Sequence, residues 1–392
     1  MSRLEELIQE LCPNGVEYKS IKETVGVNRG RRLIKSQLSD DYEYDVYHGS
    51  KDTILGKYNK FNAPADSIIV VNTGGIGGVK FVDKPFWCSD GSFWLGHCEY
   101  INDKYLYYYL SGYEQYFASK KRVGGVPTID RDVVEYFKIP VPPLEVQSEI
   151  VRILDNFTKL TTELTTELTA RKKQYEYYRD ELLNFEKNKG LVQHLKIKDI
   201  ADIYLGLTYT PTYVDNGVIF LSSQNISGDY LNLENVKYIS KEEFMQCTDN
   251  AKPRKGDILF TRVGSNLGHP TIVDVEIPLC IFVSLGYLRV KKGVSNRFIK
   301  HWMNTESFWK QVREKTQNAP KANLNTGWLK EFDIILPTLD LQEKISDILD
   351  NFAAICSNLS IGLPAEIEAR QKQYEFYRDL LLTFPENIGG VI

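Results

Sequence analysis

The sequence predicts an α+β fold in which two pseudo-symmetric mixed α/β domains are separated by two long antiparallel helices that form a coiled-coil spacer. Three observations predict it. Two sequence blocks occur twice, about half a chain apart, and each block lies in a stretch with helical heptad spacing. The segments between these stretches are rich in short β-like runs and turn residues. An internal duplication, in which each copy contributes one β-rich domain and one long helix, explains all three.

The duplication is carried by two repeated blocks. Ile153–Phe157 returns as Ile348–Phe352, and Gln174–Asp180 returns as Gln373–Asp379 with a single change. The first block is displaced by 195 residues (157 to 352) and the second by 199 (180 to 379), so the later copy holds four extra residues between its blocks. A unit of this length is too long for a solenoid repeat and fits a domain with a connecting helix.

Length and composition indicate an ordinary globular chain. With 392 residues, 42% hydrophobic and 26% charged, it should bury about two to four cores. No apolar run reaches the roughly 18 to 20 residues of a membrane span, and the acidic, amphipathic start at Met1–Ile8 is unlike a secretory signal, so we expect a cytoplasmic protein without a membrane partner. The net charge of −4 means that any nucleic-acid interface must be local.

The first long helix is predicted after Pro142-Pro143, because the stretch from Leu144 to Lys189 contains neither Gly nor Pro. Asn188-Lys189-Gly190 is its predicted end. Apolar and aromatic residues recur at steps of three and four, which predicts a heptad seam on a helix of about 40 residues that only Arg171 interrupts. The seam residues are Ile150, Leu154, Phe157, Leu164, Leu168, Tyr175, Tyr178, Leu182 and Phe185.

The second long helix repeats this pattern after Leu336-Pro337, but Gly362 and Pro364 should kink or split it. Its seam residues are Ile345, Phe352, Leu359, Tyr374, Leu381 and Phe384. Because a long apolar stripe cannot remain solvated, we expect the two helices to pair. The expected spacer and subunit-docking residues are Phe157, Leu164, Tyr175, Tyr178, Phe352, Tyr374 and Tyr377. The alternative that each helix packs only on its own domain stays open.

The predicted boundaries are residues 1–143 for the first domain, 144–189 for the first helix, 190–338 for the second domain and 339–392 for the second helix. Each domain begins with a strand that leads to a glycine, Gly30 or Gly206, and continues to an apolar strand with a glycine-rich loop. Each then has an aromatic helix, 105–117 or 298–308, and a final strand that ends in proline. The helices are nearly unchanged between the copies whereas the domains differ, which suggests one frame that presents two readers of different specificity.

Candidate nucleic-acid contacts lie in turns of both domains. In the first domain, flexible cations that flank turns can meet phosphates, and an amide opens the glycine-rich loop. These residues are Arg29, Arg31, Arg32, Lys35, Asn72, Lys120, Lys121 and Arg122. In the second domain, amides, a hydroxyl and cations are suited to base edges. These residues are Ser223, Gln224, Asn225, Arg262, Asn266, Lys321 and Asn323. The alternative that such loop charges are simply solvated stays open.

Enzyme motifs are missing from the sequence. Pro142-Pro143 lacks the flanking residues of an amino-methyltransferase site, and Gly74–Gly78 fails the spacing of a dinucleotide-binding loop. The five histidines are not at metal-ligand spacing, and the six cysteines form no CxxC pair, so neither a metal site nor a disulfide framework is expected. The pattern therefore favours binding over catalysis.

Taken together, these motifs resemble the specificity subunits of type I restriction-modification systems. The resemblance rests on the two helix entries, the repeated blocks and one strand, and it covers essentially the whole chain in order. The matching segments are Pro142–Gln147 and Pro337–Gln342, Ile153–Phe157 and Ile348–Phe352, Ala170–Asp180 and Ala369–Asp379, and Gly256–Arg262.

The resemblance implies that the two domains are target recognition domains, each of which reads one half of a split site in double-stranded DNA. The helices would set the gap and dock two methyltransferase subunits, and restriction subunits would complete the complex. This chain would be non-catalytic and bind no cofactor, since AdoMet, ATP and Mg²⁺ would belong to partners that carry the site-specific deoxyribonuclease and adenine-N6 DNA methyltransferase activities. Two alternatives stay open: a duplicated protein-binding adaptor, and an autonomous nuclease or methyltransferase with a divergent active site.

Overall fold

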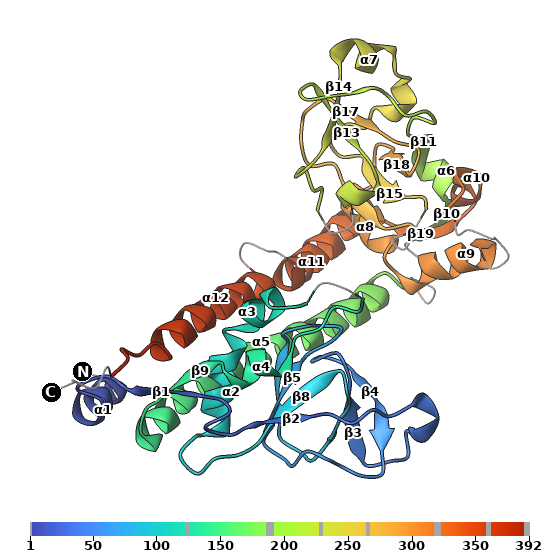
Figure 1. The fold of residues 1–392 in the computed structure, drawn as a ribbon. Helices are drawn as coiled ribbons and strands as arrows, with labels where there is room; N and C mark the ends of the chain where they lie inside the picture. Colours follow the sequence, from blue (N-terminus) through green and yellow to red (C-terminus); the bar gives the residue numbers. More distant parts are fainter. Residues whose placement is uncertain are drawn as a thin grey trace. The chain divides into compact units, whose positions relative to one another are not determined.

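The computed structural model divides the chain into two compact units, Met1–Thr165 with Ile367–Ile392 (unit 1) and Thr166–Glu366 (unit 2). Figure 1 labels their helices and strands. Each unit contains one β-rich domain and parts of the long helices, and each is described by itself. The structure describes residues 2–122, 125–185, 192–226, 230–263, 267–316, 323–357 and 362–387.

The first long helix is α5, Leu144–Leu182, an uninterrupted helix of 39 residues that confirms the predicted length. The second is split as predicted, into α11 (Leu339–Ser357) and α12 (Leu363–Leu381). Pro364 lies in the first turn of α12, where a missing N–H is tolerated. The predicted end of the first helix at 188–190 is wrong, because α5 already ends at Leu182 and the described residues 183–185 are not helical. The seam residues Phe185 and Phe384 therefore lie beyond the ends of α5 and α12. The seam residue Leu359 lies outside the described residues.

The domain of unit 1 is built from three small sheets. The four-stranded sheet is antiparallel, and the three-stranded sheet contains one parallel pair, β3 with β7. The strand orders are β1 (Glu17–Ser20) with β9 (Lys138–Val141), β2 (Val27–Arg29)–β8 (Ser92–Leu95)–β5 (Ser67–Val71)–β6 (Val79–Val82), and β4 (Ile54–Tyr58)–β3 (Tyr44–Tyr47)–β7 (Trp87–Cys88). The helices of this domain are α1 (Arg3–Leu11), η1 (Lys35–Gln37), α2 (Asp103–Ser111), α3 (Glu114–Ser119) and α4 (Arg131–Glu135).

The domain of unit 2 has the same plan. Its main sheet is antiparallel, and its second sheet again contains one parallel pair, β13 with β17. The strand orders are β10 (Val192–Lys196) with β19 (Asp333–Pro337), β11 (Ala201–Leu205)–β18 (Leu285–Val290)–β15 (Ile258–Thr261)–β16 (Pro270–Ile272), and β12 (Tyr213–Val214)–β14 (Lys237–Ile239)–β13 (Val218–Leu221)–β17 (Leu279–Ile281). The helices are α6 (Ile197–Ile200), η2 (Ser223–Ile226), α7 (Lys241–Gln246), η3 (Asp249–Ala251), α8 (Asn296–Trp302), α9 (Glu306–Thr316) and α10 (Thr326–Lys330).

The matching strand orders confirm the duplication at the level of the fold. One detail of the prediction is wrong, because the aromatic helix expected in each domain is two short helices. In unit 1, α2 ends at its C-cap Gly112 before α3 begins. In unit 2, the Thr305 hydroxyl accepts a hydrogen bond from the Phe308 N–H at the start of α9. The aromatic spacing does not show these local stops.

Gly30 and Gly206 are at equivalent places, and close backbone contact explains why both are glycine. A Cβ atom on Gly30 would lie 1.9 Å from the carbonyl oxygen of Ser89, and one on Gly206 would lie 2.2 Å from that of Phe282. Each glycine follows the first strand of the main sheet, next to the segment that ends the parallel strand of the second sheet. Only a residue without a side chain allows the two sheets to meet so closely.

A buried glutamine at the start of each long helix ties three elements of its domain together. Gln147 accepts a hydrogen bond from the Asn102 N–H at 2.7 Å and donates one to the Pro142 carbonyl at 2.7 Å. Gln342 makes the equivalent bonds. Its partners are the Ser295 N–H at 2.9 Å and the Pro337 carbonyl at 2.7 Å. In each unit the long helix, the last strand and the N-cap of α2 or α8 are therefore held at one point.

The aspartate of the repeated block makes a second attachment to the same domain helix. Asp155 accepts hydrogen bonds from Tyr108 at 2.6 Å and Lys104 at 2.8 Å, and Asp350 pairs with His301 at 2.8 Å and Arg297 at 3.0 Å. Burial alone would raise the pKa of Asp350, but the bonds from His301 and Arg297 outweigh it and lower that pKa. Burial lowers the pKa of His301 against the opposing effect of Asp350, so a neutral imidazole meets an ionised carboxylate.

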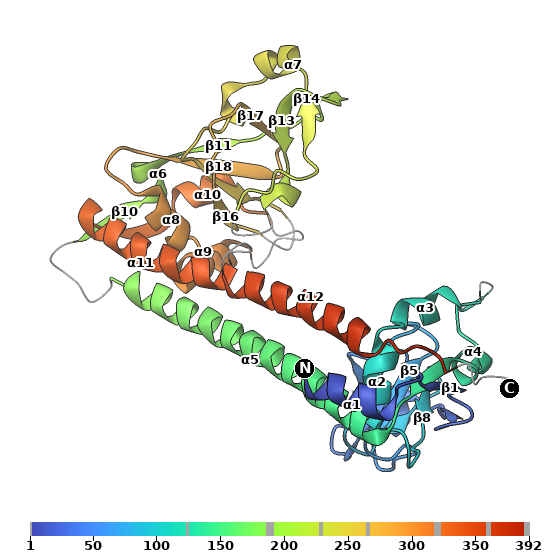
Figure 2. The same cartoon turned by 90° about the vertical axis from the view of Figure 1, so that its left-hand side faces the viewer.

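Each unit also contains a contact between the long helices. In unit 1, Phe157 of α5 stacks on Tyr377 of α12 with ring centroids 5.4 Å apart, and Figure 2 shows these helices side by side. In unit 2, Tyr178 of α5 packs on Phe352 of α11 at 5.9 Å. Phe352 is the repeat equivalent of Phe157, and Tyr377 is the repeat equivalent of Tyr178. Each unit therefore pairs the same two repeat positions, and the predicted helix pairing is confirmed.

The direction of pairing follows from the neighbouring cores. In unit 1, Phe384, beyond the end of α12, lies in one hydrophobic cluster with Ile150 from the start of α5. In unit 2, Phe185, beyond the end of α5, lies in one cluster with Ile345 from the start of α11. Within each unit, higher residue numbers on one helix go with lower numbers on the other, which is an antiparallel arrangement.

Not every expected spacer residue lies between the long helices. Tyr175 donates to or accepts from Nδ1 of His301 on α8 at 3.1 Å, and Tyr374 packs against Tyr108 on α2 with ring centroids 6.3 Å apart. Both tyrosines thus join a long helix to an equivalent domain helix, α8 in unit 2 and α2 in unit 1. Leu164 is half-buried on α5.

Candidate nucleic-acid interface

The end of the central strand β5 is where the loops of unit 1 meet. Gly75 donates to the Gly49 carbonyl at 2.8 Å, the Asn72 N–H donates to the Gly91 carbonyl at 3.1 Å, and the Ile129 N–H donates to the Asn72 carbonyl at 3.0 Å. Backbone bonds therefore hold four separate loops around the residue that follows β5. A fixed loop cluster of this kind can position side chains for recognition.

Three of the predicted contacts line one cavity at this place. Arg29, Asn72 and Arg122 come from three distant segments and border a cavity of about 320 Å³. Both arginines are exposed, whereas Asn72 is 5% exposed. The rest of the lining is Phe93, Thr128, Ile129, Asp130, Arg131 and Asp132.

The charges around this cavity are largely balanced. Arg122 forms an ion pair with Asp130 at 3.2 Å, and Arg131 forms one with Glu135 at 2.7 Å. The arginine and aspartate side chains thus present donors and acceptors together. Such a lining favours a ligand with both kinds of polar group over a simple anion.

The remaining cations predicted for unit 1 are exposed but do not belong to the lining of this cavity. Arg31, Arg32 and Lys35 follow β2, and Lys120 and Lys121 follow α3. Their position on exposed segments suits contacts with a phosphate backbone, which remain a prediction.

Unit 2 has the same arrangement at the end of β15. The Leu324 N–H donates to the Arg262 carbonyl at 2.9 Å, and Val263 forms a β-bridge with Asn323. The Ser223 N–H donates to the Ser284 hydroxyl at 3.2 Å, and the Arg262 N–H donates to the Ser284 carbonyl at 2.9 Å. Two predicted contacts, Ser223 on η2 and Arg262 after β15, are thus brought together around Ser284, and the third, Asn323, bridges the residue that follows Arg262. Asn266 and Lys321 lie outside the described residues.

The other two candidates of unit 2 differ in their surroundings. Gln224 is exposed on η2, whereas Asn225 is buried. The Asn225 side chain accepts from the Ser222 N–H at 2.9 Å and donates to the Asn232 carbonyl at 3.3 Å, so it holds its own loop. Arg262 is partly buried, and burial lowers its pKa. Its Nη1 donates to the Val283 carbonyl at 2.9 Å.

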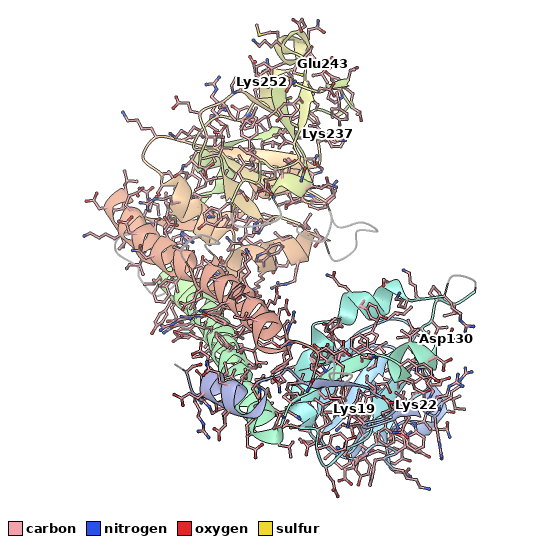
Figure 3. All side chains as sticks on the ribbon, turned by 60° about the vertical axis from the view of Figure 1, so that its left-hand side comes forward. Lys19, Lys22, Asp130, Lys237, Glu243 and Lys252 are labelled. Carbon is pink, nitrogen blue, oxygen red and sulfur yellow. The ribbon has the colours of Figure 1, made fainter. Side chains whose placement is uncertain are left out.

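Several polar residues near these sites were not predicted from the sequence. Thr128, Asp130 and Asp132 line the cavity of unit 1. Elsewhere in unit 2, around β14 and α7, Lys237 lies over the Tyr213 ring at 4.1 Å and Lys252 over the Phe244 ring at 4.9 Å. Figure 3 labels both lysines with Glu243. The two partners of each cation–π pair are not adjacent in sequence, so no local pattern indicates them.

Over the described ranges, no group of three or more His, Cys, Asp or Glu side chains is placed to hold a metal ion. Among the helices of the same ranges, none combines the length and the apolar character that a bilayer crossing needs.

Known proteins resemble this chain over nearly its whole length. The specificity subunit of the type I restriction enzyme EcoR124I/EcoR124II from Escherichia coli is 29% identical over 98% of both chains. A putative type I restriction enzyme specificity subunit from Haemophilus influenzae is 28% identical and covers 94% of this chain and 96% of its own.

Two solved structures share the fold. The S subunit of a type I restriction-modification system from M. genitalium matches with a TM-score of 0.56 at 17% identity over 95% of this chain and 97% of its own. A chain from a study of complex assembly and conformational transition in the type I R-M system matches with a TM-score of 0.63 at 15% identity over 94% and 98%.

The family model described as the type I restriction modification DNA specificity domain matches this sequence twice, over residues 13–172 and 190–369. The two matches cover most of the chain and follow its internal duplication. This chain therefore belongs to the type I restriction-modification DNA specificity family and carries two copies of its domain.

Proposed function

We propose that this chain is the DNA sequence-specificity subunit of a type I restriction-modification complex, in which each domain reads one half of a bipartite site. The observation that carries the proposal is a contrast within the duplication. The attachments of each domain to the long helices are repeated nearly unchanged, whereas the loops at the ends of β5 and β15 carry different polar residues. Two related readers on one frame suit a target with two different halves.

The long helices supply the spacing between the two readers. The uninterrupted helix α5 bears residues of both units, and each unit pairs it with a C-terminal helix. An α-helix rises about 1.5 Å per residue, and one base pair spans about 3.4 Å of DNA. About two residues of helix therefore correspond to one base pair. The helix therefore acts as the element that sets the unspecified gap.

The methyltransferase subunits bind exposed apolar residues that recur at equivalent positions on the helices of the two units. Leu160 and its repeat equivalent Ile355 are each 47% exposed, and Phe376 and its equivalent Tyr177 are 64% and 62% exposed. Large exposed apolar residues on a helix favour an interface with another protein. Their recurrence at repeat positions suits two copies of one partner, and restriction subunits then join this assembly.

Catalysis and cofactors belong to the partner subunits in this proposal. This chain contributes recognition, and the methyltransferase and restriction subunits bind AdoMet, ATP and Mg²⁺ for adenine methylation and DNA cleavage. The test is to purify the chain alone and with methyltransferase subunits, and to measure DNA binding and methylation in each. A purified chain that methylates or cleaves DNA by itself would contradict this division.

Exchange of one domain tests the two-reader proposal. Residues 20–140 are replaced by the corresponding segment of a relative with another target, and methylated sites are mapped in cells that carry the assembled methyltransferase. We expect one half of the site to change, while the other half is kept. The reciprocal exchange of residues 197–330 is the matched control and should change the other half only. A change in both halves after a single exchange would contradict two independent readers.

A further inference from the structure

We propose that the residue directly after the central strand of each domain sets the identity of one base pair in its half-site. Asn72 in unit 1 reads an adenine edge, and Arg262 in unit 2 reads a guanine edge. This inference rests on the proposed function, and it adds the residues and the bases that give each domain its specificity.

The two residues occupy the same position in the duplicated fold. Asn72 follows β5, and its carbonyl accepts from Ile129 at 3.0 Å. Arg262 follows β15, and its carbonyl accepts from Leu324 at 2.9 Å. The next residue in each copy, Thr73 or Val263, forms a β-bridge with the residue before that partner. The backbone is thus repeated while the side chain changes from an amide to a guanidinium.

Both side chains keep a buried polar atom without a partner. Neither Oδ1 of Asn72 nor Nε of Arg262 has a hydrogen-bond partner among the residues that the structure describes. Folded proteins rarely tolerate such atoms, because each one loses its hydrogen bonds to water without replacement. By contrast, the buried amide of Gln147, which attaches the domain to its helix, is bonded through both its oxygen and its nitrogen. Four other described side chains also keep such an atom, but Ser67, Ser92, Thr261 and Tyr287 lie inside strands. Asn72 and Arg262 instead lie at equivalent positions in the loops that follow β5 and β15, and this placement points to a ligand.

The cavity above Asn72 fits a nucleobase better than a phosphate. Its lining combines Arg29, Arg122 and Arg131 with the carboxylates of Asp130 and Asp132. Two of the three guanidinium groups already pair with carboxylates, Arg122 with Asp130 and Arg131 with Glu135, so the cavity is not a simple anion site. A base edge is neutral and presents donors and acceptors side by side. An asparagine amide pairs with adenine by accepting from the N6 amino group through Oδ1 and donating to N7 through Nδ2.

The guanidinium of Arg262 is prepared for a different base. Its Nη1 is already bonded to the Val283 carbonyl at 2.9 Å, which orients the group and leaves the Nε side for a ligand. A guanidinium edge donates two parallel hydrogen bonds, and guanine offers two adjacent acceptors, O6 and N7. The same fold position thus reads A·T in one domain and G·C in the other.

The experiment uses the full chain assembled with its methyltransferase subunits, with Asn72→Ala and Arg262→Ala as separate variants. Methylated sites are mapped over a genome for each. We expect Asn72→Ala to lose the preference for adenine at one position of one half-site by about tenfold or more, and Arg262→Ala to lose guanine at one position of the other half. Each variant serves as the control for the other, because the untouched half should keep its sequence.

A stability measurement separates a reading role from a structural one. Because Asn72→Ala removes an unpartnered buried atom, the unfolding temperature of the free chain should stay equal or rise. Asn72→Ser provides the same test if the alanine variant does not fold. Unchanged discrimination in folded variants would overturn the inference, as would a lower unfolding temperature with every site position weakened equally. A wild-type complex without sequence-specific methylation would instead defeat the proposed function.

Discussion

Two places in each domain differ in what the duplication has kept. One is the junction of the domain with its long helix, and the other is the end of its central strand. At the junction, both copies keep the same residue, Gln147 or Gln342, with two equivalent bonds, and Gln147 also donates to the Tyr100 carbonyl at 2.9 Å. At the strand end, both copies keep the backbone bonds but place different side chains, Asn72 and Arg262. The difference teaches that the duplicated chain holds its frame constant and varies the surface that meets a ligand.

A second comparison concerns the charge at the junction. In unit 1, Asp155 is bonded to a tyrosine and a lysine of α2. In unit 2, the equivalent Asp350 is bonded to a histidine and an arginine of α8, and Arg297 also pairs with Glu343 and Asp347 of α11. The junction of unit 2 thus contains more charged groups than the equivalent junction of unit 1, and one of its members is a titratable imidazole.

The largest expected effect comes from the shared glutamine. Gln147→Leu leaves the Asn102 N–H and the Pro142 carbonyl without this partner in a buried place, so the free energy of unfolding of unit 1 should fall by about 2–4 kcal/mol. Gln342→Leu should cost unit 2 a similar amount. Hydrogen exchange resolved by unit measures both. Gln9→Leu, at an exposed position of α1, is the matched control and should change little. A loss confined to one of the two units would break the equivalence of the junctions.

The next effect concerns partner docking. Phe376→Glu in unit 1 or Tyr177→Glu in unit 2 places a charge at one of these exposed apolar positions, and each should weaken one methyltransferase contact by about tenfold to a hundredfold, or roughly 1.4–2.7 kcal/mol. Native mass spectrometry should then show complexes with one methyltransferase subunit, and the double variant should bind none tightly. Complexes that keep both subunits in the double variant would place the docking surface elsewhere.

The carboxylates of the junction should have a smaller effect that differs between the units. Asp155→Asn and Asp350→Asn keep the shape but remove the charge, and each should lower the stability of its unit by about 1–2 kcal/mol. The loss should be larger for Asp350, because it binds the buried imidazole of His301, whereas the cationic partner of Asp155 is the exposed Lys104. Thermal unfolding followed by exchange in each unit checks the ranking. A larger loss in unit 1 would contradict the comparison.

The smallest effect is a pH dependence confined to unit 2. Burial holds the pKa of His301 below its usual value of about 6.5, so the unfolded chain binds a proton more readily than the folded one. The contribution of neutral His301 is present above pH 6.5 and is lost as the pH falls through its lower folded pKa. The free energy of unfolding of unit 2 should therefore fall between pH 7.5 and 5.5, by less than the loss expected for Asp350→Asn. The variant His301→Tyr, which places there the residue type of Tyr108, should remove this pH dependence. An equal response in unit 1 would exclude His301 as its source.

The sequence predicted the parts of this fold that depend on local periodicity. Heptad spacing and the repeated blocks identified α5 and the pairing of the two long helices, and Gly362 with Pro364 identified the place where the second one is interrupted. The spacing did not show that Tyr175 and Tyr374 face a domain helix, since a seam position specifies burial and not the partner. The prediction was therefore better for elements than for contacts.

The candidate interface was less accessible to sequence reasoning. Arg29, Asn72 and Arg122 are far apart in sequence and meet only through the order of the sheet strands. Asn225 has the polar side chain expected for base contacts, yet it is bonded within its own loop. Composition shows which side chains can bind, whereas burial and existing bonds decide which remain free to do so.

The length of the helical spacer offers the most direct test of the central claim that the helices set the gap between two readers. Thr165–Leu168 repeats the four residues of Thr161–Leu164, so its deletion removes about one helical turn, roughly 6 Å, and leaves the local sequence of α5 intact. Four residues of the second long helix are deleted with it, so that both paired helices shorten by one turn. Mapping of methylated sites in cells with the deleted chain should find both half-sites unchanged and the gap shorter by about one or two base pairs. Altered half-sites with an unchanged gap would contradict the account.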